Sequence, residues 1–244
     1  MPISSSGHLV LVEYILGNKA SSGLLFEVLV HFATMISVLI YFRKKIWNLI
    51  KSLFPPYLPD KRPFLKLCGI IVLGTIPAVV IGLAFESKIE AAFNSPRLVL
   101  VMLLITGIIL LSTRLKKTGN NPVGFKSGFL VGIAQSAALL PGISRSGSTI
   151  AAGLHLNLAP AEAAEYSFLL SLPAVFGAAV LKSLQLLSES APVESLGAYL
   201  VGAVVALVVG YISIAWLMRI MARGRFFYFG IYCVVIALAG MVIL

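Results

Sequence analysis

Long apolar runs alternate with short polar segments along the chain, and the lengths of these runs predict a membrane protein. A helix that crosses the ~30 Å hydrocarbon core of a bilayer needs about 20 apolar residues. Six runs reach or approach that length: residues 24–42, 67–85, 98–113, 163–186, 196–218 and 226–244. The run 163–186 contains Pro173 and Gly177 but is still best interpreted as a span. We therefore expect an all-α integral membrane fold of about six transmembrane helices in a single domain, 1–244.

Two further apolar stretches, 127–140 and 151–161, are too short to cross and flank a polar segment at 141–149. This pattern predicts a re-entrant hairpin whose bend is 141–149, because non-helical backbone at membrane depth needs protein or water around it. The N-terminal segment 2–8 reads Pro-Ile-Ser-Ser-Ser-Gly-His and echoes Pro-Gly-Ile-Ser-Arg-Ser-Gly-Ser at 141–148. A second re-entrant hairpin is expected there.

Basic residues are clustered in three segments between the apolar runs, at 43–66, 114–126 and 219–225. Their placement is typical of cytoplasmic loops under the positive-inside rule and gives no stripe for nucleic acid, despite a net charge of +10. The prolines within 43–66 predict an irregular or interfacial loop. With these clusters inside, the halves 1–113 and 123–244 each hold one hairpin and three spans in opposite orientations. Such an inverted-topology repeat places its site near the midplane, where broken helices meet.

Composition supports the membrane class. The chain is 59% hydrophobic and 11% charged, whereas a soluble domain carries roughly 25% charged residues.

The segment 141–149 combines hydroxyls, glycines and an arginine at a predicted helix break. Glycine lets backbone approach a ligand, a helix N-terminus offers free N–H groups, and arginine forms a bidentate fork suited to phosphate. An arginine at membrane depth costs at least ~2.5–3.5 kcal/mol, which favours a functional role for Arg145. The alternative is that Arg145 snorkels or pairs with an acid for packing.

The N-terminal segment adds Ser4, Ser5, Ser6, Gly7 and His8. A histidine three residues after Ser5 could accept the proton of a nucleophilic hydroxyl. The alternative is that serines cap a helix while His8 fills a polar gap. Glu27 and Glu165 lie at or within apolar segments, and binding a metal, anchoring a hairpin and pairing with Arg145 remain open for both.

These motifs resemble those of the bacterial undecaprenyl-diphosphate phosphatases of the bacitracin-resistance type. The motif Pro-Gly-x-Ser-Arg-Ser-Gly-x-Thr at 141–149 is intact, and similar segments extend through 2–17, 26–43, 74–82, 135–150 and 164–178. The resemblance implies a multi-pass enzyme of the bacterial plasma (inner) membrane. Its substrate would be the polyprenyl lipid undecaprenyl diphosphate, which loses its terminal phosphate so that the carrier returns to cell-wall synthesis.

By this likeness Ser5 is the candidate nucleophile, with His8 also considered for that part, and Arg145 neutralises the phosphate. The diphosphate pocket would be lined by Ser4, Ser6, Gly7, Gly142, Ser144, Ser146, Gly147 and Thr149, with Glu27, Gln135 and Glu165 in support. The family is expected to need a divalent cation, Mg²⁺ or Ca²⁺. Its members carry an acidic helix immediately before the first motif, so we expect an N-terminal truncation or a misassigned start, with the metal ligands preceding Met1.

The main rival hypothesis is a transporter or lipid flippase, because inverted repeats with broken helices are a common transporter plan. A non-catalytic scaffold is weaker, since it leaves the hydroxyl-rich segments and the arginine unexplained. The sequence is compatible with a homodimer and does not set the prenyl length.

Overall fold

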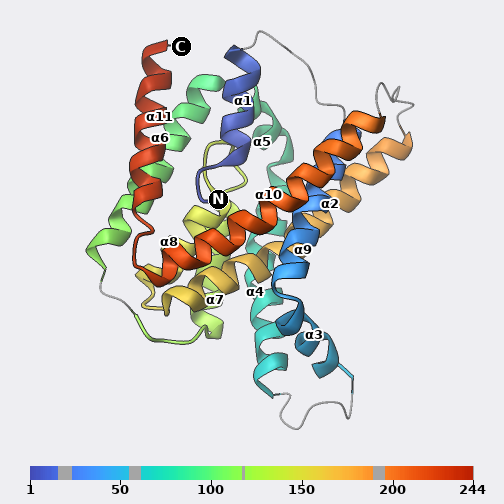
Figure 1. Cartoon of the computed structure of the whole chain (residues 1–244), viewed down its shortest axis with the longest axis vertical. Helices are drawn as coiled ribbons and strands as arrows, with labels where there is room; N and C mark the ends of the chain where they lie inside the picture. Colours follow the sequence, from blue (N-terminus) through green and yellow to red (C-terminus); the bar gives the residue numbers. More distant parts are fainter. Residues whose placement is uncertain (16–23, 55–61, 117–118, 189–195, 244) are drawn as a thin grey trace. The chain divides into compact units, whose positions relative to one another are not determined.

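The computed structural model of the chain describes residues 1–15, 24–54, 62–116, 119–188 and 196–243 (Figure 1). Helices account for the secondary structure of these ranges, apart from one isolated β-bridge between Asn121 and Leu158. The elements are α1 (Ser5–Ile15), α2 (Leu24–Tyr41), α3 (Arg43–Ser52), α4 (Arg62–Ala84), α5 (Glu86–Phe93), α6 (Pro96–Ser112), η1 (Thr113–Leu115), α7 (Phe125–Ala137), α8 (Arg145–His155), α9 (Pro160–Ser188), α10 (Leu196–Ala222) and α11 (Tyr228–Ile243).

The six predicted spans correspond to α2, α4, α6, α9, α10 and α11, which confirms an all-α integral membrane protein. Four helical segments are long and apolar enough to cross a bilayer: Arg62–Ala84, Pro96–Leu115, Pro160–Leu184 and Gly197–Ala222. The apolar helices Val28–Tyr41 and Tyr228–Ile243 are shorter. Helix α9 continues through Pro173, as expected from its apolar length.

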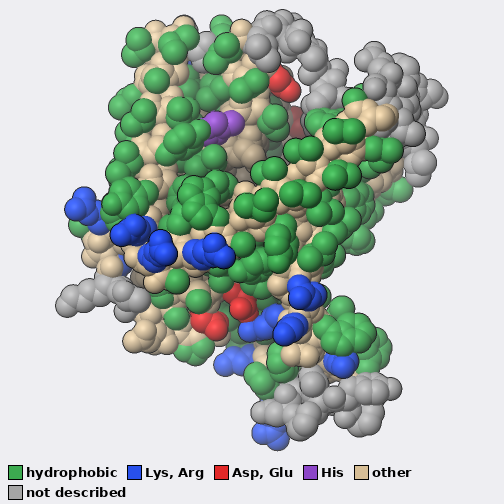
Figure 2. Space-filling model, in the orientation of Figure 1, with side chains coloured by type: hydrophobic (Ala, Val, Ile, Leu, Met, Phe, Trp, Pro, Cys, Tyr) green, Lys and Arg blue, Asp and Glu red, His purple; other side chains and the backbone are tan. Residues whose placement is uncertain are grey.

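The outer faces of these helices are apolar. On α10, Val201, Val204, Val208 and Ile212 are all exposed and recur at helical spacing, which forms a stripe suited to lipid. Figure 2 shows hydrophobic side chains over most of the visible face of α10 and α11, with Lys and Arg gathered around the turn between these helices. This distribution is typical of a helix bundle in lipid with a polar headgroup boundary at the turn.

The first basic loop differs in part from its prediction. Residues 43–52 form the regular helix α3, whereas an irregular or interfacial loop was expected, and residues 55–61 lie outside the described ranges. Helix α3 is amphipathic: Leu49 is buried, Lys44 is exposed, and the Lys51 ammonium lies 5.2 Å from the centre of the Trp47 ring. A basic helix with an exposed tryptophan fits the membrane interface, so the interfacial half of the prediction agrees with this helix. The prolines that suggested irregularity all follow α3.

The described chain forms two compact units. Among the described residues, unit 1 comprises 1–15, 69–116, 119–170 and 217–243, and unit 2 comprises 24–54, 62–68, 171–188 and 196–216. These units cut across the predicted halves 1–113 and 123–244, so the inverted repeat stays a prediction.

Unit 1 is built around α6, which contacts α1, α8 and α11. Helix α11 runs beside α6 (Figure 1), and the approach is close because two glycines face each other. A Cβ added at Gly230 would meet the Gly107 carbonyl oxygen at 2.8 Å, and one at Gly107 would meet the Gly230 carbonyl oxygen at 3.0 Å. Small residues at such a crossing let helix backbones pack tightly in lipid.

Tyr166 of α9 completes the core of unit 1. Its hydroxyl lies 3.1 Å from the carbonyl oxygens of both Ile70 and Gly128, so it bridges α4 and α7. In unit 2, the Ser37 hydroxyl of α2 donates to the Leu207 carbonyl of α10 at 2.7 Å, which joins those two helices.

Candidate functional site

The second polar motif forms a sharp bend between α7 and α8. The predicted bend covered 141–149, but α8 already begins at Arg145, so the bend is shorter than expected. The reason is an N-cap: the Ser144 hydroxyl accepts a hydrogen bond from the Gly147 N–H at 3.1 Å, and the Ser144 carbonyl accepts from the Ser148 N–H at 2.8 Å. The hydroxyl-rich residues therefore form the first turn of a helix.

Helix α6 holds this bend through Thr106, a residue that is only 1% exposed. The Thr106 hydroxyl donates to the Gly142 carbonyl at 2.9 Å and accepts from the Ser144 N–H at 3.1 Å. Gly142 has a φ of +94°, and a Cβ there would collide with the Val99 carbonyl oxygen of α6. Only glycine satisfies both the dihedral and the close approach at this position.

The first polar motif builds the same local structure. Ser4 precedes α1 with a φ of +61°, and its hydroxyl accepts from the Gly7 N–H at 3.3 Å. The Ser4 carbonyl accepts from the His8 N–H at 3.1 Å. Each motif thus places a capping serine three residues before a glycine, which gives the sequence echo a geometric counterpart.

The two motifs meet within unit 1, as the sequence predicts. A Cβ added at Gly7 would lie 3.0 Å from the Gly142 Cα, and the Ser146 hydroxyl donates to the Met1 carbonyl at 3.4 Å. The N-termini of α1 and α8 therefore begin at one junction. Free N–H groups and two positive dipole ends at the same place favour an anionic group.

Arg145 contributes a full positive charge to this junction. Within the described ranges its guanidinium forms no hydrogen bond or ion pair with another residue. A guanidinium stays protonated at neutral pH even when it is withdrawn from water, because its ordinary pKa lies so far above 7. The hypothesis that Arg145 pairs with an acid for packing is therefore not supported in the described part of the chain.

The remaining hydroxyls of the two motifs have different surroundings, and that of Ser6 lies 3.4 Å from the Ser4 hydroxyl. Ser5 is exposed, and its hydroxyl has no hydrogen-bond partner among the described residues. Thr149 is fully buried, and its hydroxyl bonds to the Arg145 carbonyl at 2.8 Å and to the Ser167 hydroxyl of α9 at 2.6 Å. Thr149 thus ties α8 to α9, while Ser5 is available for chemistry.

His8 does not bond to Ser5. Its Nδ1 lies 2.9 Å from the Ser4 carbonyl oxygen and its Nε2 lies 3.0 Å from the Tyr232 hydroxyl of α11. The spacing of Ser5 and His8 along the helix suggested that the two side chains pair. Instead, both ring nitrogens of His8 bond elsewhere, Nδ1 to the Ser4 carbonyl and Nε2 to the Tyr232 hydroxyl of α11.

The supporting residues have different surroundings. Gln135 of α7 is 3% exposed, and neither polar atom of its amide has a hydrogen-bond partner among the described residues. Glu165 lies on α9 and interacts with another residue, so it is not a free carboxylate. Glu27 lies on the backbone of α2, but its side chain is outside the described part.

The sequence did not reveal Thr106, Ser167 or Tyr232. Each is a polar side chain in an apolar span, and a polar residue at membrane depth is the sequence signal that could have pointed to them.

No group of three or more His, Cys, Asp or Glu side chains that could hold a metal ion occurs in the described ranges.

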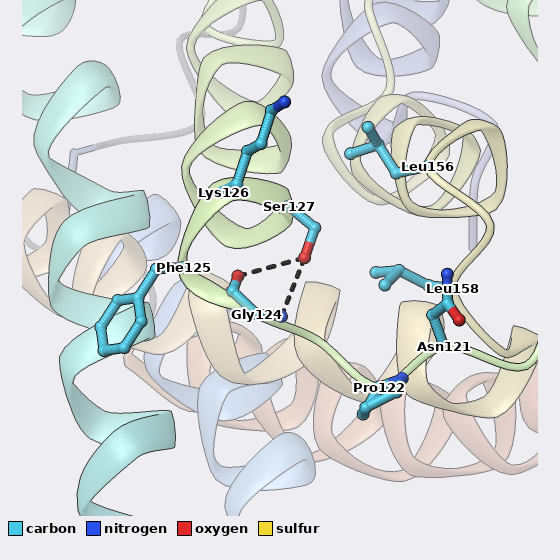
Figure 3. Close-up of a pocket in the computed structure, with 8 residues that line it drawn as sticks. All are labelled: Asn121, Pro122, Gly124, Phe125, Lys126, Ser127, Leu156 and Leu158. Carbon is cyan, nitrogen blue, oxygen red and sulfur yellow. Dashed lines mark hydrogen bonds between the residues drawn. The ribbon is translucent and has the colours of Figure 1, made fainter.

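A cavity of about 560 Å³ lies at the base of the hairpin rather than at its bend (Figure 3). It is lined by Asn121, Pro122, Gly124, Phe125, Lys126, Ser127, Leu156 and Leu158. Helix α7 separates it from the bend by roughly 20 Å, at 1.5 Å per residue. The cavity therefore lies apart from the polar junction.

Comparison with known proteins decides the family. The family described as "Bacitracin resistance protein BacA" matches residues 1–239. The chain belongs to this family. It is 44% identical to an undecaprenyl-diphosphatase of Trichlorobacter lovleyi, over 90% of this chain and 82% of the relative. Similar proteins of the same name occur in Desulfosudis oleivorans (41% identity, 97% and 90% covered) and Korarchaeum cryptofilum (40%, 98% and 91%). With its apolar spans, this family member is a multi-pass protein of the plasma membrane.

Proposed function

We propose that the chain hydrolyses undecaprenyl diphosphate to undecaprenyl phosphate and inorganic phosphate, which recycles the lipid carrier for cell-wall synthesis. The observation that carries the proposal is the junction of two helix N-termini beside the guanidinium of Arg145, which has no partner among the described residues. Its relatives are named undecaprenyl-diphosphatases and match over most of both chains.

The junction suits phosphoryl transfer because charge on the transferring phosphoryl group needs fixed positive partners. Arg145 supplies a bidentate fork for the terminal phosphate, and the first turns of α1 and α8 supply N–H donors. Ser5 lies in the first turn of α1 with an exposed hydroxyl, which makes it the preferred nucleophile. In that role its Oγ bonds to the terminal phosphorus while the bridging P–O bond breaks, and undecaprenyl phosphate leaves with the hydroxyl proton. Water then attacks the phosphoserine, which releases inorganic phosphate and restores the Ser5 hydroxyl.

A requirement for Mg²⁺ or Ca²⁺ is part of this proposal and rests on the family resemblance. Phosphate release in the presence of EDTA, followed by addition of each cation, tests it. Assembly as a homodimer is also proposed, with the exposed apolar faces of α10 and α11 available for a second copy. Light scattering of the detergent-solubilised protein tests that state.

The decisive experiment is phosphate release from undecaprenyl diphosphate by the purified chain in detergent. Ser5→Ala and Arg145→Ala should each abolish phosphate release. Arg145→Lys should lower its rate at least tenfold, because lysine cannot form the bidentate fork. Ser183→Ala and Arg43→Lys are matched controls, since the Ser183 hydroxyl bonds within α9 and the Arg43 guanidinium donates to the Ile40 carbonyl, so neither belongs to the polar motifs. A folded wild-type chain that releases no phosphate with either cation would overturn the proposal.

A flippase predicts a different result. Transbilayer movement of the lipid would survive Ser5→Ala, because transport needs no nucleophile. Family membership favours hydrolysis over this alternative.

A further inference from the structure

The two hydrogen bonds of His8 fix the proton on its ring. The partner of Nδ1 is the Ser4 carbonyl oxygen at 2.9 Å, and a carbonyl can only accept. Nδ1 therefore carries the proton in the neutral ring, and Nε2 carries the lone pair. The Tyr232 hydroxyl, 3.0 Å from Nε2, must donate to that lone pair.

The position of the Tyr232 hydroxyl is set by a helix rather than by a flexible loop. Tyr232 follows Gly230 by two residues, and Gly230 is in close backbone contact with Gly107 of α6. The next residue, Cys233, is buried with its Sγ 4.0 Å from the Pro2 carbonyl oxygen. Helix α11 thus contacts the first motif at two successive residues. The imidazole and phenol rings are nearly parallel, with an interplanar angle of 10° and centroids 5.6 Å apart.

Core packing does not explain the choice of tyrosine at this position. Tyr232 is 42% exposed, so its ring does not fill the interior of unit 1. Packing alone would be satisfied by phenylalanine.

We propose that Tyr232 is a positioning residue for His8. It fixes the orientation and tautomer of the ring and makes Nε2 the nitrogen that gains and loses a proton. The hydroxyl can serve both states of the ring, because it donates to the Nε2 lone pair of the neutral imidazole and accepts from the Nε2–H of the imidazolium. This inference rests on the proposed phosphatase function and on the part in catalysis that the family resemblance implies for His8.

The first test compares Tyr232→Phe with Tyr228→Phe in steady-state hydrolysis. Tyr228 lies one turn earlier on α11 and is 55% exposed, and its hydroxyl has no hydrogen-bond partner in the described part of the chain. Tyr232→Phe should lower kcat about tenfold with KM within about twofold, as expected for one lost hydrogen bond to a reacting group. Tyr228→Phe should change neither, and equal kcat in the two variants would overturn the inference.

A double-mutant cycle shows whether Tyr232 acts through His8. His8→Asn retains a side chain that fits the site but has no ring to position. Adding Tyr232→Phe to His8→Asn should cause no further loss if the two residues act as a unit. Fully additive losses would show an independent role for Tyr232 and overturn the inference.

Nitrogen-15 NMR of histidine-labelled protein gives a readout independent of activity. The chain has three histidines, and His8→Asn identifies the resonances of His8. Wild type should show a protonated Nδ1 and a hydrogen-bonded Nε2, whereas Tyr232→Phe should shift Nε2 toward the value of a free ring nitrogen. An unchanged Nε2 resonance would overturn the positioning role. If wild type releases no phosphate, the proposed function fails while this spectrum still decides the contact.

Discussion

Thr106→Val tests the clamp that holds the polar bend. The substitution exchanges the hydroxyl of Thr106 for a methyl group of similar size, so the shape of α6 is kept. It removes the hydrogen bonds to the Gly142 carbonyl and from the Ser144 N–H. Neither backbone group has another hydrogen-bond partner among the described residues.

The expected cost follows from the two groups left behind. A buried backbone group without a partner costs about 1–3 kcal/mol, so two such groups cost ~2–6 kcal/mol if the bend keeps its shape. If the bend relaxes to recover partners, Arg145 moves with it, because it directly follows the Ser144 cap. A displacement of ~1 Å at a reacting group can cost about 100-fold in rate. Thr106→Val should therefore lose stability, activity or both.

The assay combines phosphate release in detergent with thermal unfolding of the same preparations. Thr113→Val is the matched control, since Thr113 is buried and its hydroxyl donates only to the Leu110 carbonyl one turn back. That carbonyl still accepts the Thr113 backbone N–H, so the control leaves no buried group without a partner in the described part of α6. We expect Thr106→Val to lower the rate of phosphate release 10- to 100-fold, which is the size of loss that a misplaced reacting group causes. The control should lower that rate less than twofold. Equal unfolding temperatures and rates for the two valine variants would refute the clamp.

Three further tests address other features. Gly142→Ala should lower the free energy of unfolding by more than ~3 kcal/mol, because of the strained φ and the collision with Val99. Gly177→Ala, in open space within α9, should raise it by ~1 kcal/mol, and the reverse order of unfolding temperatures would contradict both expectations. Gln135→Met should raise the unfolding temperature, by removing a buried amide that has no partner among the described residues, and lower phosphate release at least fivefold; unchanged release would exclude a supporting role. Burial and Lys116 lower the pKa of His155, so the folded state disfavours its protonation and loses stability as pH falls below about 6.5. His155→Gln should reduce this loss of unfolding temperature between pH 7.5 and 5.5, and an unchanged dependence of unfolding temperature on pH would contradict the expectation.

The spans could be predicted because run length alone decides whether a helix crosses the membrane. The start of the helix after the second bend could not be predicted, since the run 151–161 marks where apolar residues resume rather than where the helix begins. Helix α8 starts at Arg145 because Ser144 caps it, and the polar residues of its first turn carry no apolar signal. For the first motif, the structure contains the capping serine that the alternative hypothesis named, at Ser4, and leaves Ser5 exposed.

The partners of the site residues were beyond sequence reasoning because they depend on tertiary packing. Thr106 reaches Gly142 across 36 residues, and Tyr232 reaches His8 across 224. Neither pair has a local spacing that a pattern could show. The residue types were predictable, whereas the contacts that orient them come from helices whose own sequences are read as ordinary spans.

The close backbone contact of α6 and α11 has a consequence for how the protein is made. A ribosome synthesises α1 well before α11, and membrane insertion follows chain order. The helices between α1 and α11 are therefore inserted before Tyr232 of α11 can bond to the His8 imidazole. A nascent chain can assemble both polar motifs on α6 while the imidazole still lacks its phenol partner, so the site is completed only after α11 has been inserted.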